Sequence, residues 1–249
     1  MGQYSSKDCV LLVDGYNVLG INTDLDINGE APIEESTPFG ASWATHEALG
    51  IKKGEITQNG FYDDAATSVN TALNEHQGES RIMCAGFAGN VIGRLFTGFQ
   101  GALQGNFDRI GSMGKLHRCN AKYQASGIIE DGRILHELSA ETADGDTEDT
   151  PHNNTAATDY GGAAYLQLSA LTLDGYTNIV VKVRHSDDGE TFSDLVTFTA
   201  VTAAPGKQRS TIAAGVGSIK QYLATSWAFT GSGTSPSCTF FVGVARNAS

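Results

Sequence analysis

The sequence predicts a mainly β protein with one or two short flanking helices, arranged as two β-sandwich or barrel halves. The 249 residues include 30 glycines but only 5 prolines, a composition that suits many short strands joined by turns. Charged residues make up 18% of the chain, below the usual fraction of about 25%. A low fraction is expected when neighbouring protein molecules cover part of the surface. Short apolar runs recur between turn residues, whereas one segment has clear helical periodicity.

The first half contains that helix and several strands. Asp63 and Asp64 can cap the helix, because their carboxylates accept free backbone N–H groups, and Gly78 marks its end. A single apolar stripe indicates that the helix lies against a sheet; it consists of Ala66, Val69, Leu73 and His76. Residues 24–35 are interpreted as an acidic loop. The predicted strands of this half are 10–13, 53–62, 81–88, 95–103 and 116–125.

The second half is predicted to be mostly strands. Ile179, Val181 and Val183 alternate with other residues, which places all three on one face of a strand. Residues 140–162 form a long polar and acidic stretch that we interpret as a long loop or an interdomain crossing, and Ser193-Asp194 is expected to open a second helical turn. The predicted strands of this half are 128–138, 165–171, 178–185, 195–201, 222–229 and 238–246. In the last of them, one face consists of Cys238, Phe240, Val242 and Val244.

A loose internal similarity suggests how the chain is divided. Asp14-Gly15 and Asp131-Gly132 each precede an acidic stretch, at 24–35 and 141–149 respectively. Internal similarity of this kind is a sign of repeated units. We therefore predict two β domains, residues 1–127 and residues 128–249, related by an internal duplication.

The charge and the cysteines restrict the classes of function. A formal net charge of −12 disfavours a sequence-independent grip on nucleic acid, which requires a basic patch. Cys9, Cys84, Cys119 and Cys238 are far apart and show no zinc-binding spacing, so reduced thiols in a cytosolic assembly are expected. No apolar stretch reaches the roughly 20 residues that cross a bilayer, and we expect no membrane anchoring.

No group of residues predicts catalysis. The run Asp24-Leu25-Asp26-Ile27-Asn28-Gly29 followed by Glu35 has the spacing of a calcium-binding loop, but the strand-like residues before it argue against that motif. His136 and Glu137 could serve as acid and base, although we interpret them as a solvated pair on a strand. We expect a protein that is not an enzyme and that has no cofactor and no metal.

Several segments together resemble the tail tube (major tail) proteins of bacteriophages with long, non-contractile tails. The similar segments are Val13-Asp14-Gly15-Tyr16-Asn17-Val18, Glu35-Ser36-Thr37-Pro38-Phe39-Gly40, Gly60-Phe61-Tyr62-Asp63-Asp64-Ala65, the stretch from Val183 to Phe192, and the end from Cys238 to Asn247. The resemblance implies tail-tube-type β domains that stack as rings, with inner strands forming a barrel around a channel. One such domain per chain implies a hexameric ring, and two imply a trimer with pseudo-sixfold symmetry. The internal similarity favours the trimer.

The resemblance also implies a location and partners. The subunit would assemble in the host cytoplasm into the virion tail, between the tail terminator and the distal tail proteins. DNA and the tape-measure protein would pass through the channel without sequence-specific binding, because an acidic wall repels phosphate. Our candidates for lining the channel are Asp24, Asp26, Glu30, Glu141, Asp144 and Asp146. Residues 36–49 are our candidate for an arm that contacts the next ring, with Phe39, Trp43 and His46 as its contact residues.

A second interpretation is a binding module. In this alternative the chain is a β-sandwich that decorates the virion or recognises a receptor or carbohydrate. The aromatic residues available for it are Tyr160, Tyr165, Tyr176 and Trp227.

Overall fold

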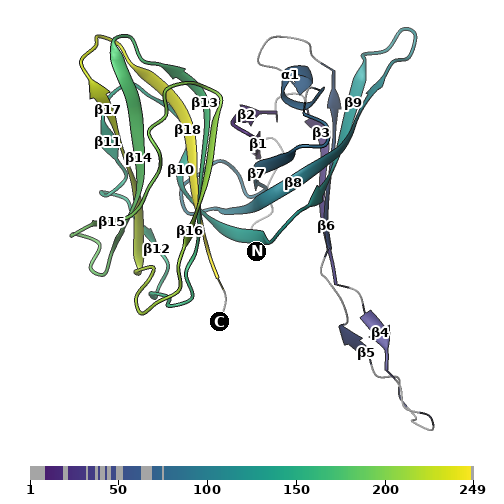
Figure 1. Cartoon of the computed structure of the whole chain (residues 1–249), viewed down its shortest axis with the longest axis horizontal. Coiled ribbons are helices and arrows are strands. Elements are labelled where there is room, and N and C mark those ends of the chain that lie inside the picture. The colour runs from purple at the N-terminus through teal and green to yellow at the C-terminus, as the bar shows by residue number, and fades with distance from the viewer. Residues whose placement is uncertain are drawn as a thin grey trace.

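A computed structural model of the chain describes residues 9–18, 22–31, 33–36, 39, 43, 46–48, 53–62, 69–74 and 76–247. Within these ranges the chain consists of β-strands and one short helix, which confirms the mainly β class (Figure 1). The strands form an 11-stranded sheet, a 5-stranded sheet and a 2-stranded hairpin. No helix among the described residues is both long and apolar enough to cross a bilayer.

The first half of the chain, which we call the N-terminal lobe, is a curved sheet with the helix packed on one face. Its strand order is β3-β6-β9-β8-β7-β1-β2. The elements are β1 (Val10–Val13), β2 (Tyr16–Asn17), β3 (Asn22–Glu30), β6 (Lys53–Phe61), α1 (Val69–Asn74), β7 (Ser80–Gly86), β8 (Leu95–Ile110) and β9 (Arg118–Ala125). Leu73 of the predicted stripe is buried, together with Ala72, in one cluster with Met83, Phe99 and Tyr123. The helix ends at Asn74, before the predicted stop at Gly78, so His76 lies beyond it. The proposed caps Asp63 and Asp64 lie outside the described residues.

Residues 24–30 belong to β3 and residues 33–35 to another strand, so the prediction of an acidic loop there is wrong. Leu25 and Ile27 of β3 pack against the core of the N-terminal lobe, while Asp24 and Asp26 between them are exposed. This alternation is the signature of a half-buried strand. Beyond β3, a hairpin of β4 (Ile33–Glu35) and β5 (His46–Ala48) projects away from both halves of the chain (Figure 1). We call residues 31–52 the arm.

The second half is a sandwich of two sheets. One layer continues the large sheet through β10 (Ile129–Glu141), β18 (Ser237–Arg246), β13 (Gly162–Thr172) and β16 (Gly206–Ile212). The other contains β11 (Gly145–Asp146), β12 (His152–Asn153), β14 (Tyr176–Ser186), β15 (Ser193–Thr197) and β17 (Tyr222–Gly231). The predicted faces of β14 and β18 are confirmed, because Ile179, Val181 and Val183 share a buried cluster with Phe240 and Val242.

Two local predictions in the sandwich are wrong. Residues 140–162 are not a free loop, since β11 and β12 lie within them and pair with β17. Ser193 begins the strand β15 rather than a helical turn, because it pairs with His185 of β14.

The two halves are joined by a shared sheet and a shared core. Strand β10 pairs with β8 on one side and β18 on the other. Phe96 from β8 packs edge-on against Tyr165 and Phe241 at centroid distances of 5.7 Å. Glycines make this packing possible: a Cβ at Gly98 would lie 2.7 Å from the Tyr165 ring, and one at Gly243 would lie 2.5 Å from Phe96. These close approaches occur within one chain.

The predicted boundary at residues 127 and 128 falls between β9 and β10. The two signals of duplication occupy different structures, since Asp14-Gly15 is the turn between β1 and β2 whereas Asp131-Gly132 lies inside β10. The division into two duplicated domains stays a prediction.

Candidate assembly and channel surfaces

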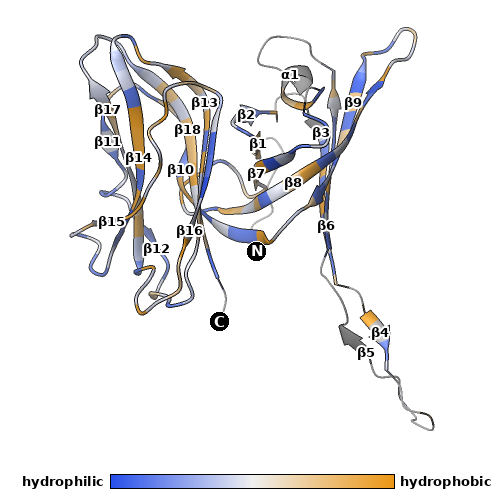
Figure 2. Cartoon of the chain, viewed as in Figure 1, coloured by the Kyte–Doolittle hydropathy of each residue, from blue (hydrophilic) through white to orange (hydrophobic). Residues whose placement is uncertain are grey.

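Four strands of the N-terminal lobe present a continuous polar surface on the side away from α1. In β6 the buried residues Ile56 and Gln58 alternate with the partly exposed Glu55, Thr57 and Asn59, so the two sides of the strand differ sharply. Strands β3, β9 and the second part of β8 follow the same pattern. Figure 2 shows that hydrophilic residues predominate along β6 and β9.

Strand register aligns these side chains in rows. Asp26 of β3 lies opposite Thr57 of β6, which lies opposite Lys122 of β9, which in turn lies opposite Asn106 of β8. The surface defined by such rows, which we call the polar face, comprises Asp24, Asp26, Asn28, Glu30, Lys53, Glu55, Thr57, Asn59, Asn106, Asp108, Arg118, Asn120, Lys122 and Gln124, none of them buried. It holds 5 carboxylates and 3 cations, so its net charge is negative.

Neutral amides hold several of the carboxylates in place. Gln124 Nε2 donates to Glu55 Oε2 at 2.7 Å, and Asn28 Nδ2 donates to Asp26 Oδ2 at 3.0 Å. Asn106 Nδ2 likewise donates to Asp108 Oδ2 at 2.8 Å. Because an amide donor carries no net charge, these contacts order the carboxylates without cancelling their negative charge.

The sheet that carries the polar face has two open edges. Among the described residues, β3 pairs only with β6, and residues 105–110 of β8 pair only with β9. An open edge exposes unpaired backbone N–H and C=O groups and can accept a strand from another chain. Both edges are therefore available for contact between copies.

The structure separates the six acidic residues that the sequence grouped as one lining. Asp24, Asp26 and Glu30 lie on the polar face. The other three, Glu141, Asp144 and Asp146, belong to the sandwich, on the far side of the molecule (Figure 1).

The sandwich carboxylates make local structural contacts. Asp144 Oδ1 accepts a hydrogen bond from the Phe229 amide at 2.8 Å, and Asp146 Oδ1 accepts one from the Glu148 amide at 2.9 Å. If all six residues lined one channel, the two groups of three would have to belong to different copies of the chain.

The predicted contact residues lie on the projecting hairpin, and two of them are exposed. Phe39 and Trp43 have exposed fractions of 111% and 84%, and His46 begins β5. Exposed aromatic residues at the end of a projecting hairpin are suited to anchoring a partner, but their role as contacts between rings stays a prediction.

His136 is buried, so its interpretation as part of a solvated pair is wrong. Register shifts at this point of β10 leave Ile134, Leu135 and His136 all buried in succession. The imidazole stacks on Phe240 at 4.0 Å between centroids and lies 4.8 Å from Trp227. Burial lowers the pKa of His136 from its ordinary value of 6.5, while Glu141, 3.3 Å away, opposes that shift.

A buried charge cluster connects the lobe to the sandwich near the first turn. Asp14 has a positive φ of 52°, and its carboxylate accepts hydrogen bonds from the side chain of Arg81 and from the Ile82 amide. Lys207 of β16 reaches the same carboxylate at 2.6 Å. Arg81 is fully buried and also donates to Gln104 at 3.2 Å. Sequence reasoning missed this cluster, because its members are far apart in the chain.

A second buried cluster crosses the same junction. Arg209 holds Glu130 through two hydrogen bonds, of 3.0 Å from Nε and 2.7 Å from Nη2. The Tyr165 hydroxyl also donates to Glu130. Burial, followed by the contact with Glu130, raises the pKa of Tyr165. The hydroxyl therefore stays protonated as a hydrogen-bond donor.

The aromatic residues of the alternative function do not form an exposed platform. Tyr165 is fully buried, and Trp227 is 8% exposed with its Nε1 donating to the Ala143 carbonyl at 2.9 Å. Tyr176 packs against Phe229, whereas Tyr160 is 51% exposed. Stacking on a sugar requires exposed ring faces, so a carbohydrate site built from this set is not supported.

The calcium-type spacing at residues 24–35 lies on β3 and β4 rather than on a loop between helices. Within the part of the chain that the structure describes, no three His, Cys, Asp or Glu residues are grouped so that they could hold a metal ion.

Comparison with known proteins yields similar structures but no sequence family. No family model matches the sequence, and no curated protein matches it. A chain of the virion of a native gene transfer agent particle is 15% identical, with a TM-score of 0.44 over 52% of this chain and 98% of that one. A chain from the tail of an empty gene transfer agent particle with C6 symmetry is 14% identical, with a TM-score of 0.41 over 51% of this chain and 97% of that one.

The third similar structure covers most of this chain. It is the Dit protein (gp 19.1) of phage SPP1, a hub protein of the adsorption apparatus, at 11% identity and a TM-score of 0.37 over 96% of this chain and 99% of that one. All three matches are therefore with components of tails or virions. With TM-scores below 0.5, they do not establish a shared fold.

Proposed function

We propose that the chain is a structural subunit of a phage tail tube, in which the polar face lines a channel for DNA. The observation that carries this proposal is the sheet β3-β6-β9-β8, which has a helix-packed core on one side, a polar and net negative surface on the other, and an open edge at each end. This arrangement requires no catalytic group.

Strand pairing between copies at the two open edges would form the ring. When β3 of one copy lies beside residues 105–110 of β8 in the next, the inner sheets of successive copies join into a barrel without free edges. Identical head-to-tail contacts that close produce a ring. We propose six copies rather than three, with the sheet of the N-terminal lobe supplying one wall segment from each copy. The sandwich then lies outside the barrel, where it can serve as the decoration that the alternative interpretation assigns to the whole chain.

The charge of the polar face suits transport. Phosphates and carboxylates repel each other. Of the three cations of the face, Lys53 lies opposite Glu30 and Lys122 lies opposite Asn106. DNA and a tape-measure protein could therefore move along this surface without being held. Contacts with terminator and distal tail proteins, assembly in the host cytoplasm and location in the virion tail belong to the same proposal.

Cross-linking tests the ring. In a Cys9→Ser background, Asp26→Cys on β3 and Asp108→Cys on β8 are combined and treated with a short bismaleimide. The other native thiols, Cys84, Cys119 and Cys238, are buried. The expected product is a ladder of covalent species that ends at six subunits.

The matched control combines Asp108→Cys with Asp187→Cys on the sandwich, whose side chain is 71% exposed, and is expected to stop at the monomer. A ladder from the control pair, or none from the β3 and β8 pair, counts against a ring built from these edges.

A further inference from the structure

The arm and the β8–β9 turn lie at opposite ends of the sheet that carries the polar face. Lys53, at the start of β6, pairs with Glu30 next to the arm, whereas Phe61, at the end of β6, pairs with Arg118 next to the turn. The eight residue steps between these ends correspond to about 26 Å at the usual rise of a strand. Figure 1 shows the arm hairpin below the sheet and the β8–β9 turn above it. Stacking copies head to tail along β6 would therefore bring the arm of one copy towards the turn of the next.

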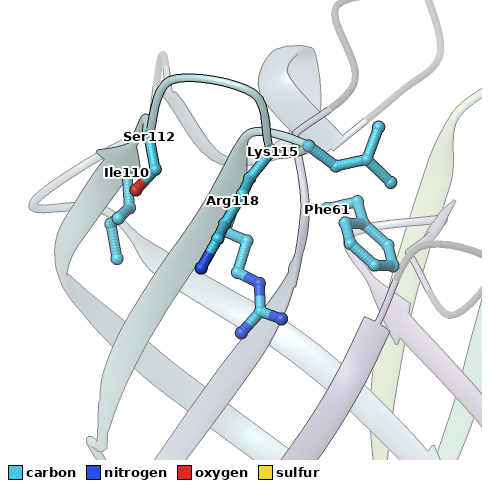
Figure 3. A pocket seen from close by; sticks show the side chains of 6 residues that line it. Phe61, Ile110, Ser112, Lys115 and Arg118 are labelled. Atoms are coloured by element: carbon cyan, nitrogen blue, oxygen red, sulfur yellow. The ribbon is translucent and has the colours of Figure 1, made fainter.

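Beside the β8–β9 turn lies a hollow whose lining includes apolar side chains and two cationic side chains. Its volume is about 520 Å³, and its lining residues are Phe61, Ile110, Ser112, Lys115, Leu116 and Arg118 (Figure 3). Ile110 and Leu116 have exposed fractions of 50% and 73%, so apolar surface is open to a partner. Neither Lys115 nor Arg118 forms a salt bridge with any described residue.

The sequence around the hollow is strongly basic for this chain. No acidic residue occurs between Asp108 and Glu130, whereas Arg109, Lys115, Arg118 and Lys122 all lie between them. In a protein of net charge −12, this positively charged stretch is suited to binding an acidic partner.

The arm has the complementary chemistry. Within residues 31–52 it contains three glutamates, Glu34, Glu35 and Glu47, and one cation, Lys52, so its net charge is negative. Among the described residues of the arm, the large apolar side chains Ile33, Phe39 and Trp43 are exposed. An acidic hairpin with large apolar residues matches a basic hollow with apolar walls in both charge and polarity.

We propose that this hollow binds the arm of a second copy of the chain in the adjacent ring, with Lys115 and Arg118 facing the glutamates of the arm. The inference rests on the proposed function, because it presumes stacked rings. The arm is long enough: nine residues, from 31 to 39, span up to about 30 Å when extended. The apolar part of the hollow favours this occupant over DNA, whose phosphates would use the cations alone.

A charge exchange tests the docking. The receiving variant carries Lys115→Glu and Arg118→Glu, the arm variant carries Glu34→Lys and Glu35→Lys, and a third protein combines all four changes. Ring formation is measured by the cross-linking described above, and mean tube length by electron microscopy. Either pair alone should leave rings intact and shorten tubes at least tenfold, and the combination should restore length to within twofold of wild type.

Two further variants complete the test. Phe39→Ser with Trp43→Ser should also shorten tubes at least tenfold, whereas Lys220→Glu on the sandwich should leave their length within twofold of wild type. Full-length tubes from the receiving variant would overturn the docking, as would failure of the combined protein to recover length while its rings remain intact. A gel-shift signal with duplex DNA that is lost in the receiving variant, with tubes unaffected, would assign the hollow to DNA instead. If the wild type forms no rings, the proposed function falls together with the docking.

Discussion

Replacing Arg81 with methionine tests the buried charge cluster around Asp14, at the side of the N-terminal lobe that meets the sandwich. Arg81 is fully buried and donates hydrogen bonds to Asp14, to Gln104 and to the Ala72 carbonyl, the last at 2.8 Å. Methionine fills a similar volume but supplies none of these donors. Removing one partner of a buried ion pair costs about 3–5 kcal/mol. Because Lys207 still neutralises Asp14 from 2.6 Å, we expect a loss near the lower end, about 3 kcal/mol.

Urea unfolding followed by tryptophan fluorescence measures this loss. Trp227 is buried and Trp43 is exposed, so the change in signal on unfolding comes mainly from the sandwich. The unfolding midpoint should fall while the slope stays unchanged, as expected when stability alone is altered. Lys182→Met is the matched control, because Lys182 and Asp194 form an exposed pair at 2.6 Å, and exposed pairs contribute about 1 kcal/mol or less.

A double-variant cycle sharpens the test. Asp14→Asn keeps a residue type that tolerates the positive φ at this turn and removes the charge that Arg81→Met leaves behind. The double variant should therefore be more stable than the sum of the single losses predicts, by about 0.5–3 kcal/mol. An Arg81→Met loss no larger than that of Lys182→Met, or additive losses in the cycle, would refute the assignment of this cluster as a buried, coupled charge network.

Three more predictions concern the shared core and the sandwich. Gly243→Ala should destabilise the protein by about 1–3 kcal/mol in the same urea assay, since its Cβ would lie 2.5 Å from Phe96; an unchanged midpoint would contradict the close packing. Tyr165→Phe should cost about 1–3 kcal/mol, because Glu130 loses a buried donor; a neutral result would mean that Arg209 alone satisfies that carboxylate. Stability should fall as pH drops from 7.5 to 5.5, because the unfolded chain takes up a proton near pH 6.5 that folded His136, with its lowered pKa, resists. His136→Phe should reduce this dependence, while His152 and His185, whose pKa values burial also lowers, retain part of it; an unaltered slope would contradict the assignment to His136.

Local alternation allowed much of the sandwich to be predicted from sequence. Ile179, Val181 and Val183 alternate without interruption, and one buried face is enough to fix that strand. In contrast, β16 has the sequence GKQRSTI, whose only buried side chain is Ile212. Its strand conformation comes from pairing with β13, a long-range contact that local pattern does not contain.

The candidate surfaces were predictable only in part. Leu25 and Ile27 alternate with Asp24 and Asp26, and this signal could have identified β3, but the density of acidic residues suggested a loop instead. Which acidic residues share a surface depends on strand order. Asp144 directly precedes β11, which pairs with β17 and not with a strand of the polar face. The bulged course of β10 that buries His136 likewise has no local sequence signal.

Cryo-electron microscopy of the assembled particle tests the central claim most directly. The account predicts six copies per ring around an open bore, with β3, β6, β9 and the second part of β8 forming its wall and with Asp24, Asp26 and Glu55 directed into it. A particle with a closed centre, or a bore lined by the sandwich with the polar face turned outward, would contradict it.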